Sequence, residues 1–129
     1  MNYLTKDEIL DLHAFVAQRY GERLGIASQD RLTSAVDAPR QVMFGAELYP
    51  DLASKAAALA FLLLKSRPFL GANEGTALLA LLRFLEINGA SMGEIGADEL
   101  VRVVRSVNYS RLDRAGLEEW LRGHLATYV

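Results

Sequence analysis

The sequence predicts an all-α fold, a compact single domain over residues 1–129 with about six helices. Three observations lead to this prediction. Apolar residues recur at three- and four-residue spacing along most of the chain, which is the pattern of amphipathic helices. No alternating apolar and polar run is long enough to compete as a strand. The length of 129 residues is close to the usual size of one domain.

The first helix has a well-defined start. Thr5 can cap its N-terminus and Glu8 can reach back to Thr5, which is the capping-box arrangement. Leu4 and Ile9 stand where a hydrophobic staple would pack. The predicted apolar stripe comprises Ile9, Leu12, Phe15, Val16 and Tyr20. Gly21 then closes the helix.

A shorter helix and an irregular segment follow. Ser28 can cap the second helix, which is expected to end near Pro39 because proline disfavours a helical conformation in the residue before it. Its apolar positions are Leu32, Ala35 and Val36. Residues 41–50 have no clear period, and 41–45 are interpreted as a short extended flap.

Two helices that are apolar on every side form the predicted centre of the fold. One covers residues 51–66, with Asp51 at its N-terminus and Lys65 near its C-terminus, where each charge complements the helix dipole. The other covers residues 73–88 and ends before Gly89. Two amphipathic helices, near 97–108 and 113–128, complete the chain. The apolar positions of the last are Leu117, Trp120, Leu121, Leu125 and Tyr128. Trp120, with Leu117, Leu121 and Tyr128, is interpreted as core, and a partner surface remains the alternative.

Composition excludes several classes of protein. The net charge is −2, so no overall attraction to nucleic acid or to an anionic membrane is expected. The chain has no cysteine, and its two histidines, His13 and His124, share no metal-ligand spacing, so no metal site is predicted. The longest apolar run is too short to span a bilayer, and no signal peptide is recognisable. A cytoplasmic location is therefore expected.

The connection between the two central helices, residues 67–75, contains one proline and two glycines. It leads into a helix N-terminus, whose unpaired N–H groups and dipole favour anions. The small residues Gly71 and Ala72, followed by Asn73, would let backbone approach a phosphate. The same residues also suit an ordinary turn with Asn73 as the helix cap. The residues alone leave both interpretations open.

This loop reads Arg67-Pro68-Phe69-Leu70-Gly71-Ala72-Asn73-Glu74-Gly75-Thr76-Ala77. It resembles the signature loop of the Fic/Doc family, which in the Doc branch is His-Pro-Phe-x-Asp-Gly-Asn-Lys-Arg-Thr-Ala. Agreement with the family extends along nearly the whole chain, and includes Tyr3-Leu4-Thr5, Leu12-His13, Phe44-Gly45, Lys55-Ala56-Ala57 and Phe84-Leu85-Glu86-Ile87-Asn88-Gly89.

The resemblance implies a helical Fic/Doc core and a family activity, the transfer of part of a nucleotide to a protein hydroxyl. Many members transfer AMP, whereas the Doc branch phosphorylates a translation factor and is paired with a small antitoxin. In the family the motif histidine is the general base and the acidic residue holds Mg²⁺. The small residue and asparagine begin a phosphate nest, and the lysine and arginine bind phosphate oxygens.

The sequence departs from the family pattern at the positions that carry the chemistry. The base position is Arg67, which cannot accept a proton because guanidinium stays protonated. The metal-ligand position is Gly71, which has no carboxylate. Glu74 and Gly75 replace the two phosphate-binding cations. The equivalent phosphate-binding loop is therefore Gly71, Ala72, Asn73, Glu74 and Gly75. Its retained scaffold is Pro68, Phe69 and Thr76.

These departures predict a Doc-like pseudoenzyme that acts through protein binding and needs no cofactor. The expected partners are a small antitoxin and a translation-factor target. Two alternatives remain open. The first is an active kinase or AMP-transferase with rebuilt chemistry, using ATP and Mg²⁺ with Arg67 as a phosphate ligand. The second is a toxin that acts by binding alone.

Other polar residues have competing interpretations. His13 is read as a partly buried histidine with a local hydrogen bond, against the alternative of a displaced base. Lys65, Arg67 and Arg83 are considered as a small anion-binding cluster, although Arg83 lies two to three turns along its helix from Asn73.

Overall fold

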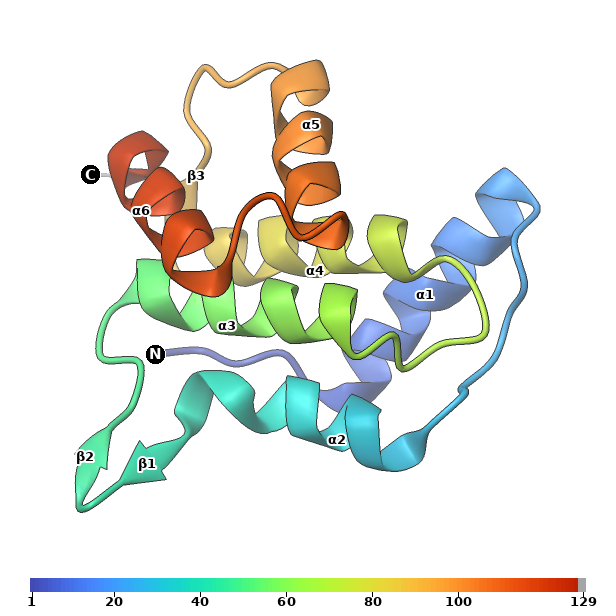
Figure 1. Cartoon of the computed structure of the whole chain (residues 1–129), viewed down its shortest axis with the longest axis horizontal. Helices are drawn as coiled ribbons and strands as arrows, with labels where there is room; N and C mark the ends of the chain where they lie inside the picture. The colour runs from blue at the N-terminus through green and yellow to red at the C-terminus, as the bar shows by residue number, and fades with distance from the viewer. Residues whose placement is uncertain (128–129) are drawn as a thin grey trace.

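The computed structural model describes residues 1–127. Within them the chain forms six α-helices with short strands between them (Figure 1). The helices are α1 (Lys6–Tyr20), α2 (Gln29–Asp37), α3 (Leu52–Lys65), α4 (Asn73–Ile87), α5 (Ala97–Asn108) and α6 (Arg114–His124). A 3₁₀ turn covers Ala38–Arg40. The strands are β1 (Val42–Met43), β2 (Ala46–Glu47), β3 (Ala90–Ser91) and β4 (Ala126–Thr127), paired antiparallel as β1–β2 and β3–β4. The predicted all-α fold is confirmed.

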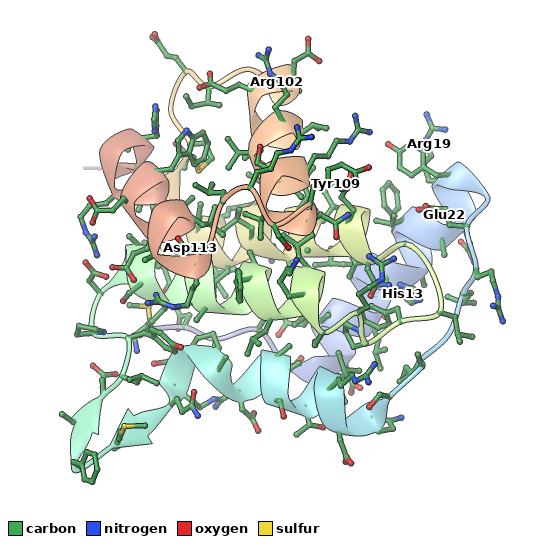
Figure 2. The ribbon with its side chains drawn as sticks, viewed as in Figure 1. His13, Arg19, Glu22, Arg102, Tyr109 and Asp113 are labelled. Carbon is green, nitrogen blue, oxygen red and sulfur yellow. The ribbon has the colours of Figure 1, made fainter. Side chains whose placement is uncertain are left out.

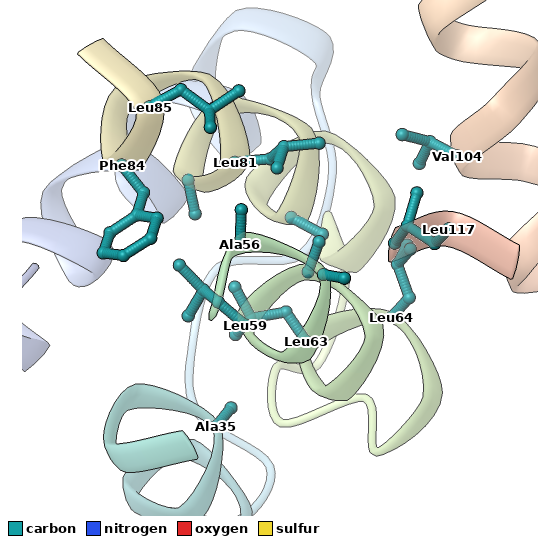
Figure 3. Close-up of a cluster of buried hydrophobic side chains, with 14 of the residues drawn as sticks. Ala35, Ala56, Leu59, Leu63, Leu64, Leu81, Phe84, Leu85, Val104 and Leu117 are labelled. Atoms are coloured by element: carbon teal, nitrogen blue, oxygen red, sulfur yellow. The ribbon is translucent and has the colours of Figure 1, made fainter. Parts of the chain in front are cut away.

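Helices α3 and α4 form the centre of the molecule, as their apolar surfaces predict. They lie side by side, with α2 along one flank and α5 and α6 on the other (Figure 1). Small buried side chains, Ala56 and Ala60 of α3 and Ala77 and Ala80 of α4, allow the helices to approach closely. Larger side chains fill the space beside them (Figure 3), among them Leu59, Leu63, Leu81, Phe84 and Leu85.

The predicted helix starts are confirmed for α1, α2 and α3. The Thr5 side chain accepts from the Glu8 backbone N–H at 3.1 Å, and the Glu8 carboxylate accepts from the Thr5 N–H at 3.2 Å. Leu4 and Ile9 are both buried, as a staple requires. Ser28 caps α2. Local sequence therefore sets where these helices begin.

Two details of the predicted helices are wrong. Phe15 and Tyr20 belong to α1 but are 56% and 68% exposed, because the buried face of α1 runs through Ile9, His13 and Val16 instead. The last helix ends at His124 rather than Tyr128, since the chain turns extended at Leu125; Tyr128 lies outside the described residues. Within residues 1–127 no helix combines the length and the apolar character needed to cross a membrane.

The predicted flap is a β1–β2 hairpin held by a buried lysine. Lys55 of α3 is 1% exposed, and its ammonium donates to the Pro39 carbonyl at 2.8 Å and to the Glu47 carboxylate at 2.9 Å. Tyr3 adds an aromatic face 5.6 Å from the same nitrogen. A buried charge is tolerated only when it is paired, so this contact fixes the hairpin to α3.

Replacing Glu47 with alanine is expected to destabilise the protein by roughly 2–4 kcal/mol, because the ammonium of Lys55 stays buried without its counter-charge. Glu86→Ala is the matched control, since Glu86 pairs with Arg83 at 3.0 Å on the exposed surface and should cost less than about 0.5 kcal/mol. Urea unfolding measures both changes. Equal losses for the two variants would contradict the role given to Lys55.

Asp51, the N-cap of α3, makes stability sensitive to acid. The Ser54 N–H bound at 2.9 Å, and the adjacent Arg122 guanidinium at 2.9 Å, lower the pKa of Asp51 from 3.8 to about 2. The charged form is favoured in the folded state, so its stabilising effect is complete above pH 4 and is lost as the pH falls toward 2. The stability difference between the wild type and Asp51→Asn should therefore shrink between pH 5 and pH 2 in urea titrations. A difference that stays constant over that range would refute the assignment.

Candidate functional site

The loop between α3 and α4 is bracketed by two residues in the left-handed conformation that are not glycine. Arg67 has φ 49° and Ala72 has φ 58°. Such conformations cost free energy and persist only when surrounding contacts hold them. The contacts come from the other side of the loop, where the Pro68 carbonyl accepts from the Ala27 N–H at 2.7 Å and the Leu70 N–H donates to the Gly25 carbonyl at 2.9 Å. The loop is thus clamped against residues 25–28.

Asn73 does not cap α4, so that interpretation of the sequence is wrong. Ala72 occupies the N-cap position, and its left-handed backbone places Asn73 in the first turn of the helix. The buried Asn73 side chain turns back over the loop, accepting from the Phe69 N–H at 3.0 Å and donating to the Phe69 carbonyl at 3.0 Å. Asn73 therefore closes the loop on itself.

Beneath the loop lies His13, whose ring stacks on Phe69 with centroids 3.9 Å apart (Figure 2 labels His13 on α1). Its Nε2 accepts from the Gly25 N–H at 3.1 Å, so the proton of the neutral ring is on Nδ1, which faces Thr76 Oγ1 at 3.3 Å. Burial lowers the pKa of His13, against the opposing attraction of Glu22. With 1% exposure and both nitrogens bonded, His13 fits the buried, hydrogen-bonded interpretation.

The two loop glycines are sites of close packing. A Cβ at Gly71 would lie 3.0 Å from the backbone N and O of Arg23, and one at Gly75 would lie 2.6 Å from Val16 Cγ1. Both approaches are shorter than ordinary contacts, and β-branched Val16 is itself buried and stiff. A side chain at either position requires movement of α1 or of the chain that follows it.

The N-terminus of α4 faces a carboxylate from its own first turn. Glu74 Oε1 accepts from Arg105 Nε at 3.1 Å, and its Oε2 accepts from Asn108 Nδ2 at 3.2 Å. Arg67 Nη1 donates to Asn108 Oδ1 at 3.4 Å. Arg67 and Glu74 are therefore linked through one asparagine of α5. Beside them, Glu74 and Gly75 line a cleft of about 430 Å³ between α1, α4 and α5.

The structure brings Lys65 and Arg67 of the considered cation cluster together at Asn108, but it does not bring Arg83 to them. Arg83 pairs with Glu86, one turn along α4, while Lys65 donates to Ser110 Oγ and Arg67 to Asn108. Sequence reasoning missed Arg105 and Asn108, the partners of Glu74. Their spacing places them on one face of a helix, yet no feature of the sequence indicates which loop that face meets.

Residues 71–75 contain one ionisable side chain, the carboxylate of Glu74. In the part of the chain that the structure describes, no three His, Asp or Glu side chains gather where they could hold a metal ion. Gly71 offers no ligand and is packed against the Arg23 backbone. The acidic side chain at the α4 N-terminus would repel a polyphosphate, although it suits the helix dipole itself. The geometry favours a closed loop stabilised by its own ion pair.

The contact between Gly75 and Val16 is testable by a double-mutant cycle. Gly75→Ala should cost about 1–2 kcal/mol in the wild type, because the new methyl group meets Val16. In a Val16→Ala background the same change should be neutral or slightly stabilising, since alanine favours a helix over glycine. Urea unfolding of the four proteins gives the coupling. An equal effect of Gly75→Ala in both backgrounds would exclude the close contact.

Comparison with known proteins agrees with this arrangement. A sequence model described as Fic/DOC family matches residues 3–85, from the residue before the α1 staple to the second half of α4. Toxin Doc of Mycolicibacterium smegmatis is 31% identical over 90 residues, which is 70% of this chain and 67% of that protein. The loop and the helices that hold it lie inside the matched region. The chain belongs to the Fic/Doc family.

Proposed function

We propose that this protein is a Doc-like member of a toxin–antitoxin system that has lost the transfer chemistry of its family and acts through protein binding. The observation that carries the proposal is the Glu74 carboxylate at the N-terminus of α4, ion-paired with Arg105 at 3.1 Å. In the family pattern this position is a lysine that binds phosphate. The replacement turns a cationic subsite into an anionic one.

Three further residues support the proposal. Arg67, at the position of the family base, is a guanidinium, which donates hydrogen bonds and accepts none. Gly71 supplies no magnesium ligand, and Gly75 supplies no phosphate-binding cation. General acid–base catalysis contributes typically 10²–10⁴-fold and electrostatic stabilisation often more. Loss of all these groups together removes most of the transfer activity. Bound ATP and Mg²⁺ are accordingly not required for the proposed role.

The partner follows from the family. One relative is named a toxin, and the Doc branch that the loop resembles pairs such toxins with a small antitoxin. We propose that this chain binds an antitoxin as its partner and a translation factor as its target. Binding needs only the folded scaffold, whose loop clamp of Pro68, Phe69 and Asn73 is intact.

Calorimetric titration of ATP, with and without Mg²⁺, tests the loss of the nucleotide site. The wild type should give no binding heat at about millimolar ATP. Glu74→Gln should give a measurable binding heat at the same ATP concentration, because it removes the charge nearest the α4 N-terminus. Glu86→Gln, an equal charge change at the far end of α4, is the matched control and should leave the affinity unaltered.

Micromolar binding by the wild type, about −8 kcal/mol, would overturn the proposal in favour of a transferase with rebuilt chemistry. In that case Arg67→Ala should weaken the binding, since the alternative uses Arg67 as a phosphate ligand. If Glu86→Gln binds ATP as tightly as Glu74→Gln, the net charge of the protein controls nucleotide binding rather than the charge in the loop.

A further inference from the structure

Helix α5 lies beyond the residues that the family model matches, and its exposed side is rich in arginine. Arg102, Arg105, Ser106, Tyr109 and Arg111 line a depression of about 310 Å³, which we call the α5 hollow. Tyr109 is 67% exposed, and the three arginines are exposed as well. Figure 2 shows Arg102 and Tyr109 along α5, with Asp113 at the start of α6.

Two of the three arginines of the α5 hollow are not held in an ion pair by any described residue. Among residues 1–127, Arg102 and Arg111 form no ion pair, and Arg105 uses only its Nε, toward Glu74. Lys65 and Arg67 reach the same end of α5, where both bond to Asn108. Four acids lie nearby: Glu74 in its ion pair, Asp113, which caps α6, and Asp98 and Glu99, one helical turn before Arg102 on α5.

This concentration of cations contrasts with the rest of the protein. The five basic side chains are more than a third of the 14 in a chain that carries 16 acids. Apart from Glu74, Asp98, Glu99 and Asp113, the rest of the chain carries 12 acidic and 9 basic side chains, so it is net acidic. A long polyanion such as a nucleic acid would extend from the α5 hollow onto that repulsive surface. A short acidic segment would not.

An apolar cleft adjoins the α5 hollow. Arg105 lines both the hollow and the cleft of about 430 Å³ beside the loop. The cleft has aliphatic walls from Val16, Leu78, Val101 and Val104. Two acids line the cleft, Glu74 and Glu22. Glu74 pairs with Arg105, whereas Glu22, at the α1 end, forms no ion pair with a described residue. A ligand that covers both depressions needs carboxylates at the α5 end and apolar side chains toward α1.

We propose that the cleft and the α5 hollow together bind an amphipathic acidic segment of a partner protein. Carboxylates of the segment pair with Arg102, Arg111 and the free Nη groups of Arg105, which form strong bidentate hydrogen bonds to carboxylates. Its apolar side chains enter the aliphatic cleft. Arg and Tyr are the side chains that most often dominate protein interfaces. The proposal specifies the partner chemistry for the binding role proposed above, and in that respect rests on it.

The test uses a fluorescein-labelled peptide of about 14 residues, with Leu and Ala in one half and Glu and Asp in the other. Its anisotropy is measured with the full chain at low and high salt. Binding should weaken with salt, and a peptide with Gln and Asn in place of the acids should bind at least about tenfold more weakly. Amide chemical shifts should change at residues 101–111.

Arg102→Gln/Arg111→Gln should weaken acidic-peptide binding at least about tenfold. Arg31→Gln/Arg83→Gln removes the same charge from exposed positions on α2 and α4. This control should change the affinity for the acidic peptide less than about twofold. Circular dichroism confirms that both pairs fold. Absence of binding at about millimolar peptide, equal binding of the neutral peptide, or tighter binding of a single-stranded oligonucleotide of similar length would each overturn the proposal. ATP is also titrated into Arg102→Gln/Arg111→Gln. Nucleotide binding that these changes leave unaltered, together with peptide binding that they weaken, would reject only the loss of transfer chemistry.

Discussion

The close contact between α3 and α4 is the constraint on which the rest of the structure depends. Alanines on both helices remove the bulk that would hold the two backbones apart, and leucines beside them fill the remaining volume. The two helices offer apolar surface on all sides, so every other helix has a face to bury against one of them. The loop that joins them is therefore anchored at both ends by the two buried helices at the centre of the protein.

Much of this arrangement can be predicted from the sequence, because local signals determine it. Thr5, Ser28 and Asp51 mark helix starts, and the all-round apolar helices identify the centre. The buried face of α1 is harder to predict from the sequence. Phe15 and Val16 are adjacent in the same apolar stripe, yet only Val16 is buried. Periodicity gives the angular width of a stripe, and tertiary packing decides which edge of it meets the core.

The loop shows the same division between local and long-range information. Its composition indicates a special turn, and its position before a helix indicates an exposed N-terminus. The role of Asn73 depends on the left-handed backbone of Ala72. Alanine rarely adopts this conformation, so the sequence does not indicate it. The pairing of Glu74 with Arg105 joins residues 31 positions apart and depends on where α5 crosses α4. Such contacts are properties of the packed chain rather than of any segment.

The glycines at 71 and 75 also bear on the history of the loop. Where a position has no side chain, neighbouring atoms can occupy the space, and here the Arg23 backbone and the Val16 side chain lie where the Cβ atoms would be. A later return of a long or charged side chain at either position would then have to overcome a steric cost before any catalytic benefit appeared. The order of substitutions therefore matters. Val16 of α1 must become smaller or move before position 75 of the loop can carry a side chain. Packing of this kind favours glycine at both positions and gives any larger side chain there a steric cost.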